Sequence, residues 1–252
     1  MKKYVIYLAV MFGCASVYAQ ETIKLISLQD PDLDDKITAH INKYSNLDIF
    51  SGVVLLAEKG QPVYHKAFGE ANREKGVKNK LTTLFNIGSM NKTFTSTIIY
   101  QMVEEGQIRL DDKLTDYISG FKDPRVKKVK ITHLLNHSSG FGDYFFDGFI
   151  DAPLSEKTLS SLTGRAKNDR LLFEPGSGNE YSNTGYVLLG AVIEKVSGKT
   201  YPDNVQDRIL KPLGLHDTYV ENLDRVRERQ AMGYLRTPMG EMEVNDGRWE
   251  LP

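Results

Sequence analysis

The sequence predicts an α/β fold of the α+β kind, in which an antiparallel sheet begins early in the chain and a mostly helical part follows. Two observations favour this class. Apolar runs at 52–57 and 63–68 flank a short polar segment, which is typical of a β-hairpin. Further on, apolar residues recur at helical spacing in two separate segments. The composition agrees, since 40% hydrophobic and 26% charged residues in 252 are usual for a globular protein.

The first twenty residues predict a secretory signal peptide. Lys2 and Lys3 precede an apolar run at 5–12, and small residues end at Ala19 before a polar segment. Because the apolar run is short for a membrane span, we expect cleavage after Ala19, a periplasmic or secreted location and no integral membrane span. An alternative takes Cys14, the only cysteine, as a lipoprotein processing site through which the protein is lipid-anchored.

The remaining elements follow in order along the chain. A helix-like stretch at 37–44 precedes the hairpin, and a single two-stranded hairpin needs further structure to complete its sheet. A second helix is indicated by Phe94, Ile98, Ile99, Met102 and Val103, with Gly106 just past its end. Then come 131–136, a turn at 138–140, a Gly/Pro-rich loop at 174–178, and a helix at 186–196 ended by Gly198. We therefore expect a signal peptide at 1–19 and one domain at 20–252, divided into part of the sheet (20–88), a mainly helical part with the active site (89–220) and an irregular segment (221–252).

The charge balance and the residue spacings exclude several classes of function. With 32 Lys and Arg against 33 Asp and Glu, the net charge of −1 gives no basic field for nucleic acid, so a small-molecule or peptide substrate is expected. His133 and His137 have the spacing of a helical zinc site, but Leu134 stands where H-E-x-x-H requires an acidic residue. We expect no metal and assign both histidines to capping and turn bonding. Lys199 belongs to no phosphate loop, because the required earlier glycine is absent, so no cofactor is expected.

One aromatic cluster allows two interpretations. Tyr144, Phe145, Phe146 and Phe149 lie close together, with Gly142 and Gly148 among them. The cluster could line a substrate cleft or pack as a loop on the helical core. The sequence favours neither.

Ser89 and Lys92 fit the motif S-x-x-K at the start of the second helix. Residues three apart share a helix face, so the lysine amine can reach the serine hydroxyl. Serine is a poor nucleophile until a base takes its proton, and a lysine does so only when burial or nearby positive charge lowers its pKa. The positive end of a helix dipole supplies such charge and also stabilises a developing oxyanion.

Tyr181 and Asn183 fit the motif Y-x-N, directly before the last predicted helix. A tyrosine can share proton transfer with a lysine, and an asparagine can hydrogen-bond both the lysine and a substrate amide. Either motif alone is common by chance. Their combination indicates Ser89, Lys92 and Tyr181 as candidate catalytic residues and Asn183 as a candidate substrate contact.

Four strings extend this argument to a family: FNIGSMNKTFTS (85–96), ITHLLNHSSG (131–140), EPGSGNEYSNTGY (174–186) and KPLGLHDTYV (211–220). They resemble the serine β-lactamase-related and penicillin-binding protein family, in the branch of class C β-lactamases, D-alanyl-D-alanine carboxypeptidases and related esterases. The resemblance implies a β-lactamase/transpeptidase-like fold. It also implies an exported serine hydrolase in which Ser89 is acylated, Lys92 is its base, Tyr181 is a second proton-transfer group and Asn183 contacts the substrate amide.

The same family has a third motif that is not found here. It consists of Lys or His, a small residue and Gly on a central strand, whereas Lys199 and Thr200 are followed by Tyr201. The resemblance implies further strands, a second oxyanion donor and a closing helix after Pro252, so the sheet is expected to be incomplete. A second hypothesis follows, that of a catalytically silent or truncated member that acts as a binding protein or is a non-functional fragment.

Overall fold

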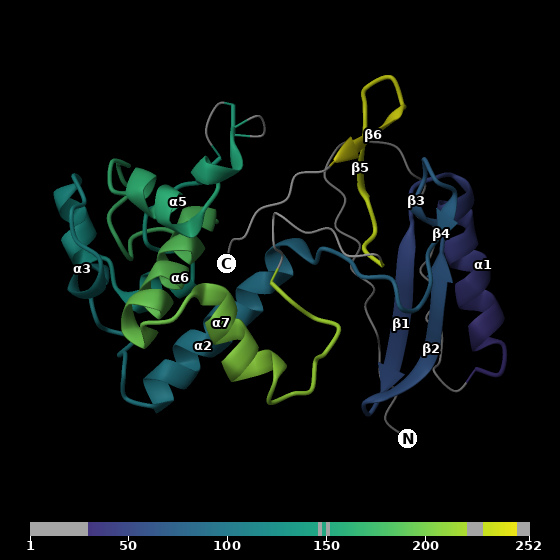
Figure 1. Cartoon of the computed structure of the whole chain (residues 1–252), viewed down its shortest axis with the longest axis horizontal. Coiled ribbons are helices and arrows are strands. Elements are labelled where there is room, and N and C mark those ends of the chain that lie inside the picture. Colours follow the sequence, from purple (N-terminus) through teal and green to yellow (C-terminus); the bar gives the residue numbers. More distant parts are fainter. Residues whose placement is uncertain (1–29, 146–147, 150–151, 221–228, 246–252) are drawn as a thin grey trace. The chain divides into compact units, whose positions relative to one another are not determined.

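The computed structural model describes residues 30–145, 148–149, 152–220 and 229–245, so the predicted signal peptide and Cys14 lie outside the described residues. The chain divides into two compact units, Met1–Thr83 and Leu84–Pro252 (Figure 1). From the sequence, the boundary between the sheet part and the helical part of one domain was expected between residues 88 and 89. All four candidate site residues lie in the second unit.

In the first unit, the described residues 30–83 form a long helix and two hairpins (Figure 1). Helix α1 (Leu33–Asn46) is followed by β1 (Gly52–Glu58) and β2 (Gln61–Phe68), which pair antiparallel and confirm the predicted hairpin. The α1 helix contacts β2, where the hydroxyls of Thr38 and the buried Tyr64 are 3.0 Å apart. Strands β3 (Glu70–Asn72) and β4 (Val77–Lys78) form a second short pair. Among the described residues, every sheet of the chain has two strands.

The second unit is mainly helical, as predicted for this part of the chain. Its α-helices are α2 (Lys92–Glu104), α3 (Leu114–Tyr117), α4 (Ile131–Leu135), α5 (Leu159–Ala166), α6 (Asn183–Ser197) and α7 (Tyr201–Val205). Short 3₁₀ turns at Gly88–Asn91, Pro124–Lys128 and Leu154–Glu156 and a π-helical turn at Gln206–Leu210 connect them.

Helix α6 forms the centre of the core of this unit. It contacts α2, α3, α4, α5 and α7, of which Figure 1 labels α2, α3, α5 and α7 around it. The α2 residues Ile98, Ile99 and Met102 are fully buried, and so are Leu188, Leu189, Val192 and Ile193 of α6. Each such side chain contributes about 1.5–3 kcal/mol of transfer free energy. The core therefore fixes the two helices whose first turns carry the candidate site.

The C-terminal segment contains a hairpin that was not predicted. Strands β5 (Gly233–Arg236) and β6 (Met242–Asn245) pair antiparallel within the segment 221–252, which was expected to be irregular. Their side chains are largely exposed, so the apolar alternation that would reveal a strand is weak. Upstream of this hairpin, the Leu84 N–H donates to Arg229 and the Leu84 carbonyl accepts from Ala231. The segment that leads to Ser89 is thereby held in place.

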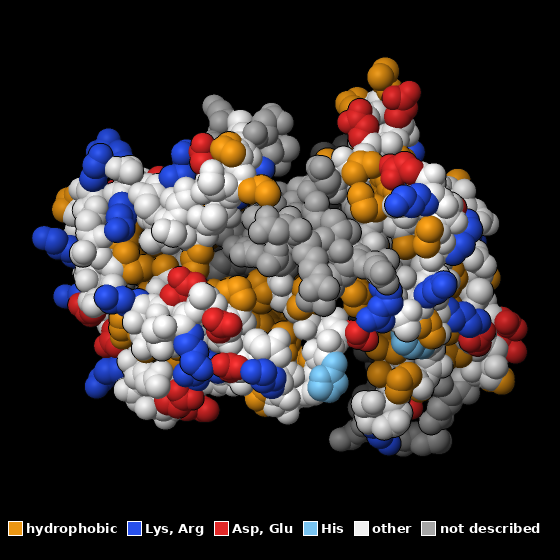
Figure 2. Space-filling view, in the orientation of Figure 1, with side chains coloured by type: hydrophobic (Ala, Val, Ile, Leu, Met, Phe, Trp, Pro, Cys, Tyr) orange, Lys and Arg blue, Asp and Glu red, His pale blue; other side chains and the backbone are white. Residues whose placement is uncertain are grey.

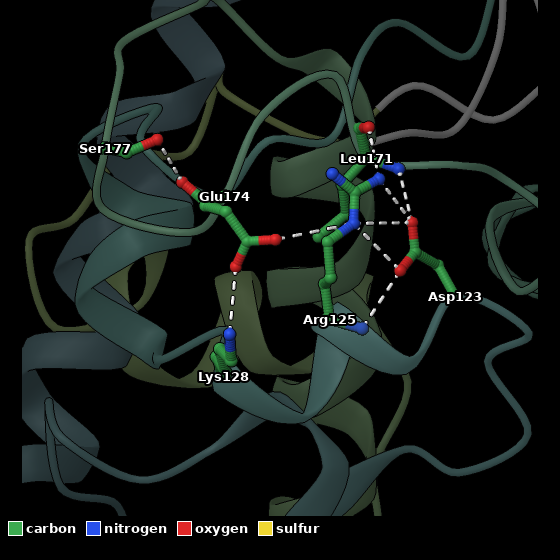
Figure 3. Close-up of polar contacts among 6 residues, drawn as sticks. All are labelled: Asp123, Arg125, Lys128, Leu171, Glu174 and Ser177. Carbon is green, nitrogen blue, oxygen red and sulfur yellow. Dashed lines mark hydrogen bonds and ion pairs between the residues drawn. The ribbon is translucent and has the colours of Figure 1, made fainter.

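A polar network also ties two distant segments of the second unit together (Figure 3). The Asp123 carboxylate accepts hydrogen bonds from the Arg125 guanidinium at 2.6 Å and from the Leu171 backbone N–H at 3.0 Å. Arg125 also donates to the Leu171 carbonyl, and Lys128 pairs with Glu174 at 3.0 Å. The Arg125 hydrogen bonds hold the pKa of Asp123 well below its usual range. This network fixes the segment that leads into the loop before Tyr181.

The surface of each unit carries charges of both signs. Figure 2 shows Lys and Arg side chains interspersed with Asp and Glu on the visible face, in keeping with the near-zero net charge. Within the described ranges, no helix combines the length and apolar character that crossing a membrane requires.

Candidate active site

Ser89 lies in a tight turn at the entrance to α2. The 3₁₀ turn Gly88–Asn91 precedes the helix, and Gly88 has a φ of +54°, a value that side chains disfavour. The Gly88 N–H donates to the Asn86 side chain at 2.8 Å. Ser89 is exposed, and the first N–H groups of such a turn have no partner within the helix. Ser89 is therefore presented at the surface of the unit, at the start of α2.

Lys92 is brought directly against this serine by the 3₁₀ geometry, in which residues three apart eclipse one another. Its amine nitrogen Nζ lies 3.2 Å from Ser89 Oγ and 2.7 Å from Asn183 Oδ1. The same nitrogen lies 5.3 Å from the ring centroids of both Tyr181 and Tyr186, within range of a cation–π interaction. The amine is thus held between a hydroxyl, an amide oxygen and two aromatic rings.

Asn183 is the first residue of α6, and both ends of its amide are engaged. Oδ1 accepts from Lys92, while Nδ2 donates to Asp143 Oδ2 at 2.9 Å. An amide has one accepting end and one donating end, so an ammonium on one side and a carboxylate on the other define its orientation. Asp143 was not identified from the sequence.

Ser182 anchors the Y-x-N segment between the two candidate residues. It is buried, and its Oγ accepts from the Gly185 N–H and donates to the Gly142 carbonyl, both at 2.8 Å. The first of these bonds is a helix N-cap, which satisfies an N–H that the helix leaves unpaired. The N-cap fixes the start of α6 and with it the positions of Tyr181 and Asn183.

His137 supports the ring of Tyr181. The two ring centroids are 4.5 Å apart, and His137 Nδ1 accepts the Ser182 N–H at 3.1 Å. A nitrogen that accepts carries no proton, so the imidazole is neutral here. Burial first, and the charge of Lys92 second, lower the pKa of His137 below 6.5. The residue has a left-handed φ of +61° and lies directly before the turn expected at 138–140.

The structure therefore brings all four predicted site residues together in the second unit. Ser89, Lys92 and Asn183 form one hydrogen-bonded series, and the half-exposed Tyr181 lies with its ring beside the lysine amine. His133 lies elsewhere, where its Nδ1 accepts from the Lys130 N–H at 3.2 Å. In the part of the chain that the structure describes, no group of three His, Cys, Asp or Glu residues is arranged to hold a metal ion.

The aromatic cluster divides between the core and the surface. Phe149 is buried with Leu162 and Val187, whereas Phe145 is about half exposed. Both rings contact Tyr144. Phe146 lies outside the described residues. Phe149 therefore packs in the core, whereas the half-exposed ring of Phe145 forms part of the surface, two residues from Asp143 in the sequence.

The chain is similar to several known proteins. A family model described as Beta-lactamase matches residues 32–250. The chain is 37% identical over 194 residues to penicillin-binding protein 4* of Bacillus subtilis, covering 74% of this chain and 42% of that protein. It is 29% identical over 200 residues to teichoic acid D-alanine hydrolase of Staphylococcus aureus, covering 79% and 48%. The solved structure of the octameric penicillin-binding protein homologue from Pyrococcus abyssi aligns with a TM-score of 0.77 and 31% identity over 86% of this chain and 51% of that chain.

The chain spans about half the length of these relatives. The solved structures confirm the predicted β-lactamase/transpeptidase-like fold. Because the family model covers most of the sequence, the resemblance stated from the motifs is confirmed. The chain belongs to the beta-lactamase family, whose members are serine hydrolases.

Proposed function

We propose that this protein is an exported serine hydrolase that forms an acyl-enzyme through Ser89 on an amide, β-lactam or ester. One observation carries the proposal: the Lys92 amine lies within hydrogen-bond reach of both Ser89 Oγ and Asn183 Oδ1. A nucleophile, a base and a group that orients the base form the arrangement that covalent catalysis requires.

In the proposed reaction, Ser89 Oγ attacks the carbonyl carbon of the substrate. Its proton passes to the amine of Lys92, which must first have released a proton of its own, and Tyr181 beside that amine relays a proton to the leaving group. The oxyanion of the tetrahedral intermediate accepts a hydrogen bond from the Ser89 N–H. Collapse of the intermediate breaks the bond to the leaving group, and water then hydrolyses the acyl-serine to release the acid.

Asn183 has two roles in this scheme. Its Oδ1 holds the Lys92 amine at 2.7 Å, and the amide contacts a substrate amide, as the family resemblance implies. The residues present supply this chemistry without a metal or cofactor, because proton transfer and oxyanion stabilisation both come from protein groups.

The substrate classes are supported by the relatives. One is named for hydrolysis of D-alanine from teichoic acid, and others are named for binding penicillin. A D-alanyl ester or amide and a β-lactam each present a carbonyl to the serine. Export is supported by the basic, apolar and small-residue pattern of residues 1–19.

The proposal is tested by hydrolysis of a penicillin, a phenyl ester and a D-alanine anilide by the 252-residue chain. Ser89→Ala should abolish hydrolysis, while Ser160→Ala, a change at an exposed serine of α5, should leave it unchanged. Circular dichroism must show that every variant folds. Equal hydrolysis by Ser89→Ala would refute the proposal. A folded chain that binds penicillin reversibly without hydrolysing any substrate would favour a binding protein instead.

A further inference from the structure

The Asn183 amide has hydrogen-bond partners at both ends, and only one of the two, Lys92, belongs to the sequence motifs. Its Oδ1 faces Lys92 at 2.7 Å, and its Nδ2 faces Asp143 Oδ2 at 2.9 Å. Asp143 lies 40 residues earlier in the chain, in the loop after α4. The contacts thus run in one series from Ser89 through Lys92 and Asn183 to this carboxylate.

The orientation of the Asn183 amide determines whether the Lys92 amine faces the amide oxygen or the NH₂ group. The two ends of an amide have almost the same shape, so packing alone hardly distinguishes them. A flip by 180° would turn the NH₂ group toward the lysine amine and the oxygen toward the carboxylate, which pairs two donors and two acceptors. A carboxylate accepts and never donates when ionised, so Asp143 permits only the orientation that directs Oδ1 at Lys92.

Asp143 is itself held in place. The Phe145 N–H donates to its Oδ1 at 3.3 Å, which leaves Oδ2 for Asn183. The preceding residue, Gly142, accepts the Ser182 hydroxyl through its carbonyl at 2.8 Å. The loop is therefore attached to the start of α6 at two successive residues, so the carboxylate approaches Asn183 from a fixed direction.

We infer that Asp143 is a positioning residue that fixes the Asn183 amide and, through it, places the Lys92 amine against Ser89. The inference rests on the proposed acyl-enzyme function. Asp143 acts on the rate at which Ser89 is acylated, because it holds the amide whose oxygen holds the Lys92 amine.

A competing role is open to the same carboxylate, since it is exposed next to the site. A carboxylate there could bind the ammonium group of an aminoacyl substrate. The two roles differ in measurable ways. A positioning role affects every acylating reagent and disappears once Asn183 is removed, whereas a binding role affects only substrates that carry a positive charge.

The test is a double-mutant cycle on the 252-residue chain. Rate constants for modification of Ser89 are measured by quenched flow and intact mass with three reagents. A neutral fluorophosphonate phosphonylates the serine and releases fluoride, whereas p-nitrophenyl acetate and D-alanine p-nitroanilide acylate it. The variants are Asp143→Ala, Asp143→Asn, Asn183→Ala and the double variant Asp143→Ala/Asn183→Ala. Glu180→Gln is the matched control, because it removes an exposed negative charge one residue before Tyr181.

Asp143→Ala should lower the maximal rate of Ser89 modification about fivefold for all three reagents. The concentration for half-maximal rate should stay unchanged for the fluorophosphonate and for p-nitrophenyl acetate, which carry no amide for Asn183 to contact. Asp143→Asn should recover part of the loss, because its amide oxygen still accepts from Asn183. Glu180→Gln should act like the wild type. In the Asn183→Ala background, Asp143→Ala should have no further effect, since coupled residues are not additive.

Three results would overturn the inference. One is an equal loss from Asp143→Ala with and without Asn183. Another is a loss confined to D-alanine p-nitroanilide, which would assign the carboxylate to the substrate ammonium. A third is a wild-type chain that folds but takes no acyl group. That result would refute the proposed function as well, whereas the first two, in a chain that is acylated, would refute the positioning role alone.

Discussion

Removal of the Asp123 carboxylate should destabilise the second unit through one buried backbone group. The Asp123 side chain is 5% exposed and accepts the N–H of Leu171, which is buried. In Asp123→Ala no acceptor remains for that N–H, and the Arg125 guanidinium loses its carboxylate (Figure 3). The change therefore removes one of the contacts that join the segment around residue 123 to the segment that leads to Tyr181.

The expected magnitude follows from these contacts. A buried N–H that loses its acceptor costs about 1–3 kcal/mol. We add nothing for Arg125, because its side chain is 30% exposed and water can replace the lost partner. A loss of about 2 kcal/mol lowers the thermal midpoint by about 4–8 °C in a unit of roughly 150–250 residues. Asp123→Asn should lose less, because its amide oxygen still accepts one hydrogen bond.

The assay is thermal unfolding followed by circular dichroism, with Asp207→Ala as the matched control. Asp207 also forms ion pairs, with Lys199 and Lys211, which lower its pKa to about 2. Both ion pairs are exposed to solvent. Asp207→Ala should therefore shift the midpoint by less than about 2 °C. Equal midpoints for Asp123→Ala and Asp207→Ala would refute the argument that burial of the acceptor determines the cost.

The same carboxylate predicts a dependence on pH. The pKa of Asp123 is depressed in the folded chain, so its contribution to stability is present above the unfolded value of 3.8 and is lost as pH falls below it. Wild-type chain should lose more stability than Asp123→Ala between about pH 4 and pH 2. Parallel pH profiles for the two proteins would contradict this assignment.

Three further predictions follow from single residues. Gly140→Ala should lower the thermal midpoint by several degrees, because φ is +85° and a Cβ would lie 2.5 Å from the Phe173 carbonyl oxygen. Gly164→Ala, in a helix with open space around it, should raise the midpoint slightly. A lower midpoint for Gly164→Ala than for Gly140→Ala would contradict the reasoning. Burial lowers the pKa of His137 below 6.5, so the stability of the folded chain should fall as pH drops below about 6.5. His137→Asn should make this fall of stability with pH less steep. An equally steep fall in the thermal midpoints of the variant would refute the role of His137. Ser182→Ala removes the N-cap of α6 and should cost about 1–2 kcal/mol in denaturant unfolding, so a loss below about 0.3 kcal/mol would exclude the cap as a stabilising contact.

Local signals in the sequence predicted the elements that have a strong pattern of their own. The spacing of Ile98, Ile99 and Met102 indicated α2, and the glycines at 106 and 198 both have the positive φ expected just after a helix. The hairpin of β1 and β2 was found for the same reason, because two apolar runs flank a polar turn. The β5–β6 hairpin escaped notice because its strands have four residues each and few buried side chains.

Long-range contacts explain what the sequence did not reveal about the site. The motifs located Ser89, Lys92, Tyr181 and Asn183, since each motif is compact in sequence. Asp143 reaches Asn183 across 40 residues, and no local pattern marks a carboxylate that will meet an amide so far along the chain. His137 was assigned to turn bonding, and it does lie in a turn; its contact with the ring of Tyr181 arises only when α4 and α6 pack together.

The central claim is that Lys92 activates Ser89, and the mass of a covalent adduct tests it most directly. The folded chain is incubated with a fluorophosphonate, and the modified peptide is identified by mass spectrometry. We predict one adduct, on Ser89, that is absent in Ser89→Ala and forms at least about tenfold more slowly in Lys92→Ala. Labelling at another serine, or labelling of Ser89 at the same rate in Lys92→Ala, would contradict the claim.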